Sequence, residues 1–217
     1  MHGFYRTIKA YLERPIEAVS RLHSKGSENV PDEGGVLIVS NHLSWADPFM
    51  VGAAIHRPAH FIGKEALFRT PLLGPFLTGM GQIKVDREHG RNEGAIRACA
   101  RLASAGKVIG IYPEGTRARP GQVKRGKTGV ARIAALSGAP VVPVGCDTGA
   151  FWPKGRTLPH LGQPVYLSIG APMHLDVKTE DLHDRAKMQA ATDLVMAEVE
   201  RLYRDCVRAR EEGEKWP

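Results

Sequence analysis

The sequence has few cysteines, few aromatic residues and no long apolar run, and each scarcity argues against a class of protein. Cys99, Cys146 and Cys206 are widely spaced and odd in number, which disfavours a disulfide framework or a zinc site and fits a reducing compartment. Aromatic residues make up 6% of the chain and form no strip with basic residues on which bases could stack, so no nucleic-acid partner is expected. No run approaches the roughly 20 apolar residues that are needed to span a bilayer.

Acidic residues are also in the minority, because 30 Lys and Arg face 23 Asp and Glu, for a formal net charge of +7. That surplus indicates an anionic partner, such as a phosphorylated substrate or an acidic membrane surface. The length of 217 residues, of which 42% are hydrophobic, is sufficient for one α/β domain with a substantial core.

Short apolar segments alternate with segments of helical periodicity along most of the chain. This alternation predicts an α/β fold, with a mainly parallel mixed sheet flanked by helices. Strands are expected at residues 36–40, 59–63, 82–85, 107–112 and 140–146, with a possible edge strand at 165–169. Helices are expected at about residues 48–55, 92–105, 128–137 and 179–210.

Two further segments are apolar, and the sequence leaves more than one interpretation of each open. Residues 2–24 have the pattern of one amphipathic helix with a possible kink at Pro15, so residues 1–30 either associate with a membrane or pack on the domain formed by residues 31–217. Periodicity alone slightly favours packing on the domain. Residues 66–83 combine leucine and phenylalanine with several prolines and glycines. They are a candidate acyl-chain groove or membrane-contacting loop, or else ordinary core packing.

His42 and Asp47 lie five residues apart, directly after the apolar strand predicted at 36–40. On one helix they would point about 140° apart, so they can meet only if the chain bends between them. Pro48 favours such a bend and makes Asp47 a candidate N-cap. Imidazole moves protons near neutral pH, and a carboxylate fixes its tautomer, so His42 could deprotonate a substrate hydroxyl without a serine or cysteine nucleophile. The alternative is a helix cap beside an unrelated turn histidine.

Charged side chains follow three other predicted strands, at the edge where open α/β sheets bind ligands. Lys64 follows the second strand, Asp86 and Arg87 follow the third, and residues 114–117 follow the fourth. Arg117 can hold two phosphate oxygens, and Lys64 adds a point charge. Gly115 permits close backbone approach and Thr116 offers a hydroxyl donor. One site for a substrate with a phosphate and a hydroxyl is a simpler interpretation than four unrelated surface charges.

Residues 121–128, with the sequence GQVKRGKT, match the nucleotide-binding pattern G-x-x-x-x-G-K-[ST]. That loop requires a strand leading directly into its first glycine. The predicted strand at 107–112 ends well before Gly121, with Pro113 and Pro120 between them. A nucleotide-dependent protein, or a non-enzymatic protein that only binds anionic membranes, therefore remains a remote alternative, and a basic loop beside the phosphate site is favoured.

Taken together, these residues resemble the 1-acyl-sn-glycerol-3-phosphate acyltransferase family. Four blocks occur in the family's order over residues 36–146, and although each alone would be weak, their joint match is specific. The blocks are Asn41-His42-x-x-x-x-Asp47-Pro48, Phe61-x-x-Lys64 with Gly81-x-Ile83-x-Val85-Asp86-Arg87, Pro113-Glu114-Gly115-Thr116-Arg117, and residues 139–144. The family also carries a basic, glycine-containing stretch after its third block, which accounts for residues 121–128.

The resemblance implies a glycerolipid acyltransferase in which His42, oriented by Asp47, activates the free hydroxyl of lysophosphatidic acid. The acyl donor would be acyl-coenzyme A or acyl carrier protein, with no metal and no further cofactor. Lys64, Arg117 and, more weakly, Arg87 would bind the acceptor phosphate, with Gly115 and Thr116 beside them. Glu114 would order the loop or contact the acceptor. The resemblance also implies that residues 1–30 associate with a membrane, so the expected location is peripheral, on the anionic cytoplasmic face of the cell membrane. Other acceptors remain open, namely glycerol 3-phosphate, another lysophospholipid or a lyso-amino-acid lipid.

Overall fold

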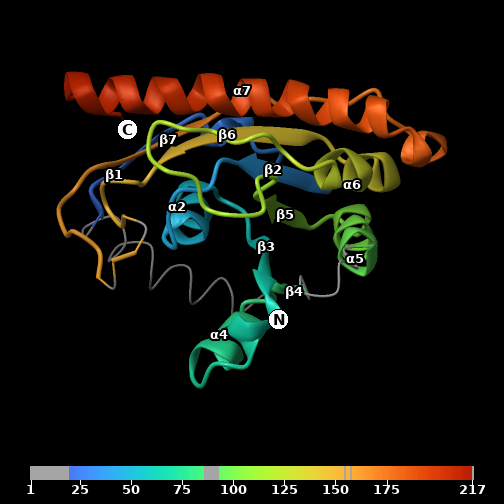
Figure 1. Cartoon of the computed structure of the whole chain (residues 1–217), viewed down its shortest axis with the longest axis horizontal. Helices are drawn as coiled ribbons and strands as arrows, with labels where there is room; N and C mark the ends of the chain where they lie inside the picture. The colour runs from blue at the N-terminus through green and yellow to red at the C-terminus, as the bar shows by residue number, and fades with distance from the viewer. Residues whose placement is uncertain (1–19, 86–92, 154, 157, 217) are drawn as a thin grey trace.

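The computed structural model describes residues 20–85, 93–153, 155–156 and 158–216. Within these residues, seven strands form one sheet in the order β1-β7-β6-β2-β5-β3-β4 (Figure 1). All neighbouring strands run parallel except β6 and β7, which are antiparallel. The strands are β1 (Leu22–Lys25), β2 (Val36–Ser40), β3 (Ala59–Lys64), β4 (Ile83–Val85), β5 (Val108–Ile111), β6 (Val141–Asp147) and β7 (Val165–Ile169).

Helices cover both faces of this sheet, which explains why β2, β5, β6 and β7 are buried along their whole length. One face carries α5 (Glu93–Ser104), α6 (Gly129–Ser137) and α7 (Arg185–Glu212), whose apolar residues pack with Leu37, Ile109 and Val141. The other face carries α2 (Asp47–Ala54), which packs against Ile38, Val108 and Val142. The central strands therefore form a rigid platform between two apolar layers.

The predicted strands are confirmed to within about two residues, but two details of the prediction are wrong. The strand at 165–169 is not at an edge, because β1 pairs on its outer side, with Leu22 opposite Val165. The helix predicted from residue 179 begins at Arg185, after a short 3-10 helix at Thr179–His183. Asp184 separates the two and caps α7 by accepting a hydrogen bond from the Lys187 amide at 2.9 Å.

The amphipathic helix predicted for residues 2–24 falls mostly outside the described residues, and the division at residues 30 and 31 stays a prediction. At the end of that segment, Leu22–Lys25 forms strand β1 and no helix. Helical spacing of apolar residues continues as far as Leu22, and a four-residue strand is too short to show alternation of its own. Among the described helices, none is both long and apolar enough to cross a membrane.

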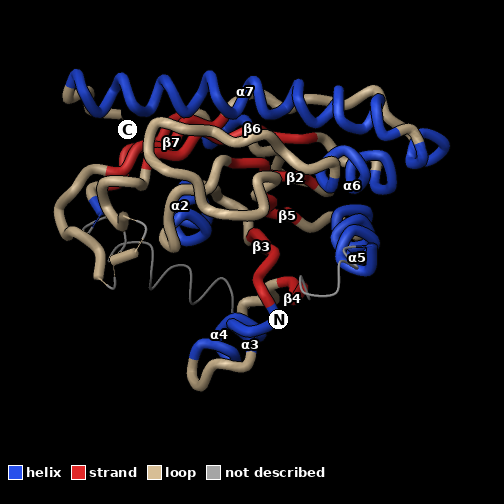
Figure 2. Tube along the Cα trace, viewed as in Figure 1, coloured by secondary structure: helices blue, strands red, loops and turns tan. Residues whose placement is uncertain are grey.

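Residues 66–83, for which three interpretations were open, form most of a helical hairpin that stands away from the sheet (Figure 2). The hairpin consists of α3 (Glu65–Phe68) and α4 (Leu73–Gly79), and the chain then returns to the sheet as β4. A side chain at Gly74 would lie 2.1 Å from the Phe68 carbonyl oxygen, so the close crossing of α3 and α4 requires glycine there.

Helix α7 approaches β6 so closely that Gly145→Ala is expected to destabilise the fold. A Cβ atom at residue 145 would lie 2.2 Å from backbone atoms of Leu202 and Tyr203, which cannot move without displacing the helix. We expect a loss of about 3 kcal/mol in the free energy of unfolding, measured by urea denaturation. The control is Gly94→Ala in α5, where nothing lies within 4 Å and alanine is the better helix former. Equal stability of Gly145→Ala and wild type would contradict this packing.

Candidate active site

Three adjacent parallel strands bring the candidate catalytic groups to one edge of the sheet. Strand β2 lies between β5 and β6, and all three end at the same edge. His42 follows β2, Glu114 follows β5 and Thr148 follows β6. Asn41 joins two of these ends, because its side-chain amide donates to the Cys146 carbonyl at 2.9 Å and its amide oxygen accepts from the Cys146 amide at 2.8 Å. The residue before His42 is therefore fixed to β6.

His42 and Asp47 form a hydrogen-bonded pair, with 2.7 Å between Nδ1 of the imidazole and Oδ2 of the carboxylate. The same oxygen accepts from the backbone amides of Leu43 and Ser44 at 2.7 and 2.9 Å. The hydroxyl of Thr148 donates to the other carboxylate oxygen. Because Asp47 accepts, Nδ1 carries the proton and Nε2 keeps its lone pair, which is the tautomer required of a general base.

The predicted bend brings the pair together, but Asp47 is not the helix N-cap. Helix α2 begins at Asp47, its N-cap is Ala46, and no side chain caps its first turn. Pro48 occupies the start of the helix as expected. The Asp47 side chain instead turns back onto the amides that precede the helix, so it orders the turn that carries His42.

Three further contacts hold His42 in place. Its ring stacks on Tyr112, with 4.4 Å between ring centroids and 22° between the ring planes. Its carbonyl oxygen accepts from the Ala118 amide at 2.7 Å, and its own amide donates to Oε1 of Glu114 at 3.0 Å. The imidazole is 20% exposed, whereas Asp47 is fully buried. The base is thus accessible while its orienting carboxylate is not.

Glu114 is an internal support of His42, because only 4% of its surface is exposed. Its second carboxylate oxygen, Oε2, is buried without a hydrogen-bond partner in the described part of the chain. Burial raises the pKa of Glu114 to about 7, although the hydrogen bond from the His42 amide acts in the opposite direction. Of the two roles predicted for Glu114, its contact with the His42 backbone favours ordering the loop over contacting the acceptor.

Of the other predicted acceptor-binding residues, Gly115, Thr116 and Arg117 follow Glu114 directly in the chain. The Arg117 guanidinium lies over the ring of Trp45, 4.7 Å from its centroid, and Trp45 is itself exposed. Thr116 is exposed, and Gly115 has φ +70°, with Lys127 Nζ 3.1 Å from where a Cβ would lie. Lys64 is exposed at the end of β3 and, within the described residues, makes no hydrogen bond or ion pair to His42 or Asp47. Arg87 lies outside the described residues.

Comparison with known proteins assigns this site to a family. The family model described as Acyltransferase matches residues 21–147, which is more than half of the chain. The chain belongs to the acyltransferase family.

Several named relatives of this acyltransferase are 1-acyl-sn-glycerol-3-phosphate acyltransferases. The protein from Borreliella burgdorferi is 35% identical over 66% of this chain and 58% of its own length, and the protein from Bacillus subtilis is 30% identical over 74% and 83%. The match thus spans less than two thirds of the first relative and more than two thirds of the second. The crystal structure of a 1-acyl-sn-glycerophosphate (LPA) acyltransferase from Thermotoga maritima has a TM-score of 0.68 and 25% identity, covering 91% of this chain and 82% of that one.

Sequence reasoning missed two residues of the acyltransferase site. The Thr148 hydroxyl donates a hydrogen bond to the second carboxylate oxygen of Asp47, and the Tyr112 ring forms the wall against which His42 stacks. Burial raises the pKa of Tyr112 well above its usual value, so this wall is neutral. Both residues follow directly on strand ends at the catalytic edge, after Ile111 and Asp147. The strand-end rule would have found them had it not been restricted to charged side chains.

The loop at residues 121–128 does not have the features of a nucleotide-binding loop. No strand leads into Gly121 in the described structure, and helix α6 begins only at Gly129. The Gly121 amide donates to the Tyr203 hydroxyl at 2.8 Å, and the Lys127 amide donates to the Pro113 carbonyl at 3.0 Å. Two amides that would bind phosphate are therefore already occupied. No group of three or more potential metal-ligand side chains occurs within the described ranges.

The raised pKa of Glu114 gives a test that uses the pH dependence of stability. A carboxyl whose pKa is higher in the folded than in the unfolded state stabilises the fold below its unfolded pKa, and this stabilisation is lost as pH rises through the folded value. The stability of Glu114→Gln relative to wild type should therefore increase as pH rises from about 4.5 to about 7. The increase in unfolding free energy should be about 2 kcal/mol after allowance for screening, and the difference should stay constant at higher pH.

The measurement is urea denaturation of both proteins at several pH values between 5 and 8. Glu65→Gln is the matched control, because the ion-pairing hydrogen bonds of Lys84 and Arg69 lower the pKa of that surface carboxyl. Its stability difference from wild type should stay constant over this range. A constant difference for Glu114→Gln as well would show that Glu114 does not titrate there.

Proposed function

We propose that this acyltransferase moves a fatty acyl group from acyl-coenzyme A or acyl carrier protein to the free hydroxyl of 1-acyl-sn-glycerol 3-phosphate, giving phosphatidic acid for phospholipid synthesis. The observation that carries the proposal is the 2.7 Å hydrogen bond between His42 Nδ1 and the fully buried Asp47, which leaves Nε2 available at an accessible edge. The similarity to 1-acyl-sn-glycerol-3-phosphate acyltransferases supports the choice of acceptor.

In the proposed mechanism, His42 Nε2 removes the proton of the acceptor hydroxyl while Asp47 stabilises the imidazolium that forms. The resulting alkoxide oxygen attacks the thioester carbonyl and forms the new carbon–oxygen bond of a tetrahedral intermediate. When the intermediate collapses, the carbon–sulfur bond breaks, and the departing sulfur takes the proton from His42. The histidine is then neutral again, and no acyl-enzyme forms. The proposal includes no metal and no cofactor besides the acyl donor.

Arg117 is proposed to bind the acceptor phosphate, together with Lys64 and Arg87. Its guanidinium is already positioned by stacking on Trp45, so little conformational freedom is lost when it forms two parallel hydrogen bonds to phosphate. Thr116 and Gly115, directly before Arg117 in the chain, are proposed to lie beside the phosphate. The lipid acceptor and the net charge of +7 support peripheral binding to the anionic cytoplasmic face of the cell membrane.

The first test compares thiol release from acyl-coenzyme A, with lysophosphatidate as acceptor, by wild type and His42→Ala. Loss of the general base should lower the rate by about two to four orders of magnitude. The matched control is His56→Ala, which removes a surface histidine that is paired with Asp32 at 3.1 Å and should keep full activity. Equal turnover by His42→Ala and wild type would refute the mechanism. If no variant turns over, the same comparison is made with acyl carrier protein as donor.

A second test concerns Arg117→Lys, which keeps the positive charge and loses both the two-pronged phosphate contact and the stacking on Trp45. We expect the KM for lysophosphatidate to rise about tenfold or more, with kcat changed much less, because a hydrogen bond to a charged group contributes about 1.5–3 kcal/mol. The control acceptor is a monoacylglycerol, which lacks the phosphate and should respond little to the substitution. A proportional loss with both acceptors would assign Arg117 a structural role.

A further inference from the structure

The tip of the α3–α4 hairpin is an exposed apolar surface. Leu72 at the tip is 88% exposed, the largest exposed fraction among the large hydrophobic residues of the described chain. Pro71 and Pro75, on either side, are also exposed. The hairpin stands at the far side of the molecule from α7, which Figure 1 shows plainly. We refer to residues 69–75 as the hairpin tip.

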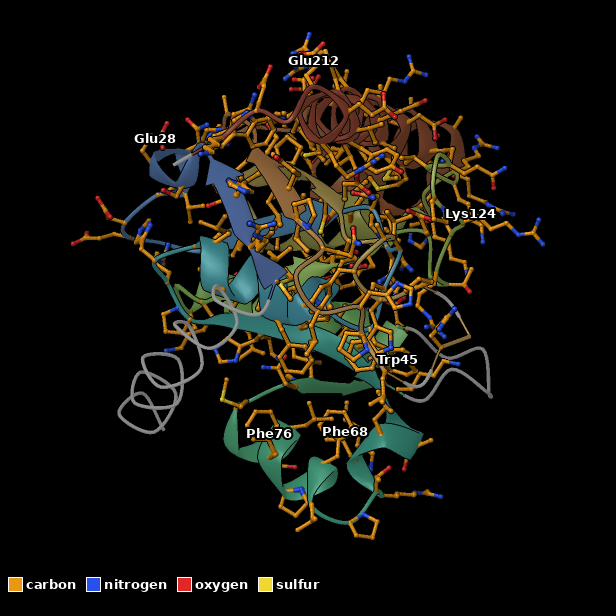
Figure 3. The ribbon with its side chains drawn as sticks, turned by 90° about the vertical axis from the view of Figure 1, so that its left-hand side faces the viewer. Glu28, Trp45, Phe68, Phe76, Lys124 and Glu212 are labelled. Atoms are coloured by element: carbon orange, nitrogen blue, oxygen red, sulfur yellow. The ribbon has the colours of Figure 1, made fainter. Side chains whose placement is uncertain are left out.

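The inner face of the hairpin is already packed against the domain. Phe68 and Phe76 lie on the side of the hairpin that faces the sheet (Figure 3). The Phe68 ring lies against β3, since a Cβ atom at Gly63 would be 3.0 Å from it. The apolar tip is therefore a second, outward surface of the hairpin, in addition to the face that packs on the domain.

The backbone at the tip holds Leu72 outward in an unfavourable conformation. Leu72 has φ 68° and ψ −50°, and the Leu73 amide donates to the Pro71 carbonyl at 2.8 Å, which makes Leu72 the centre of a γ-turn. Glycine would adopt this conformation without strain, whereas leucine is penalised through its Cβ. A strained, solvated leucine is costly to stability, so its presence favours a binding role.

The charges around the tip identify an anionic partner. Residues 66–85 contain no aspartate or glutamate. Arg69 and Lys84 both pair with Glu65, each at 2.9 Å, and Lys64 is exposed nearby in the sequence. The hairpin therefore carries Arg69 at its tip, and Lys64, Glu65 and Lys84 lie where it joins the sheet, so basic side chains outnumber acidic ones by three to one. Apolar residues with a basic surround are the composition that binds the headgroup region of an anionic bilayer.

We propose that the hairpin tip inserts into the surface of an anionic phospholipid bilayer. Leu72 and its flanking prolines enter the boundary between headgroups and acyl chains, while Arg69 and Lys84 contact lipid phosphates. The choice of a lipid as partner over an acidic protein rests on the proposed function, whose acceptor is itself a lipid. The hairpin directly follows the end of β3, and Trp45 and Phe68 lie toward the same end in Figure 3, opposite Glu28 and Glu212. Insertion would thus turn the catalytic edge toward the bilayer.

The test places an environment-sensitive fluorophore at the tip of the full-length protein through Leu72→Cys. Cys99, Cys146 and Cys206 are all buried, and burial raises the pKa of the Cys99 thiol to about 12, so the new thiol reacts selectively. With vesicles of phosphatidylglycerol and phosphatidylcholine, the emission should increase and shift to shorter wavelength. Vesicles of phosphatidylcholine alone should give a smaller shift. This measurement needs no turnover, so its failure is distinct from failure of the proposed reaction.

The matched control is Leu194→Cys, labelled in the same way. Leu194 is an exposed leucine, at 58%, on α7 at the other side of the sheet, and its fluorophore should not respond to vesicles. A response of both labels, or of neither while the protein sediments with the vesicles, would overturn the proposal. Absence of any vesicle binding would overturn it too. A shift of the Leu72 label that depends on protein concentration without vesicles would assign the tip to contact between copies of the chain.

Discussion

The buried carboxylate of Asp47 is the interaction on which the geometry of the site depends. It accepts four hydrogen bonds, from the His42 ring, two backbone amides and the Thr148 hydroxyl. These donors come from the turn after β2 and from the end of β6. A buried carboxylate without them would carry a large desolvation cost, so the fold is stable only when the turn, the helix and β6 meet around it. The arrangement that orients the imidazole is therefore also the arrangement that satisfies the buried charge.

Glu114 also belongs to this site but, unlike Asp47, it lowers the stability of the fold near neutral pH. Its Oε1 atom fixes the His42 amide, but its Oε2 atom is buried without a described partner, and its pKa is raised to about 7 by burial. Near neutral pH the protein therefore loses some stability at this position. We interpret that loss of stability as the cost of fixing the His42 backbone amide. Within the described residues, the acceptor of that amide is Glu114, which follows β5.

The sequence was informative wherever the decisive feature was local. The continuous apolar run of β2 predicted a buried strand, and Pro48 predicted the bend that lets His42 meet Asp47. What it could not supply depends on contacts between distant segments. Thr148 reaches Asp47 only because β6 lies beside β2 in the sheet, although the two residues are 101 positions apart. Strand β1 is likewise defined by its pairing with β7 and not by its own four residues.

The side chains around His42 argue for direct transfer to the substrate hydroxyl over an acyl-enzyme. The nearest serine hydroxyl after His42, that of Ser44, is buried, donates to the Trp152 carbonyl at 3.0 Å and accepts from the Ala46 amide at 3.1 Å. The thiol of Cys146 is buried, and desolvation raises its pKa well above the usual value, so it is a poor nucleophile. Both groups are thus committed to structure. With these groups unavailable, the accessible nitrogen of His42 can act as a base only on a group that arrives with the substrate. The hydroxyl of the acceptor lipid is such a group, because it can give its proton to His42.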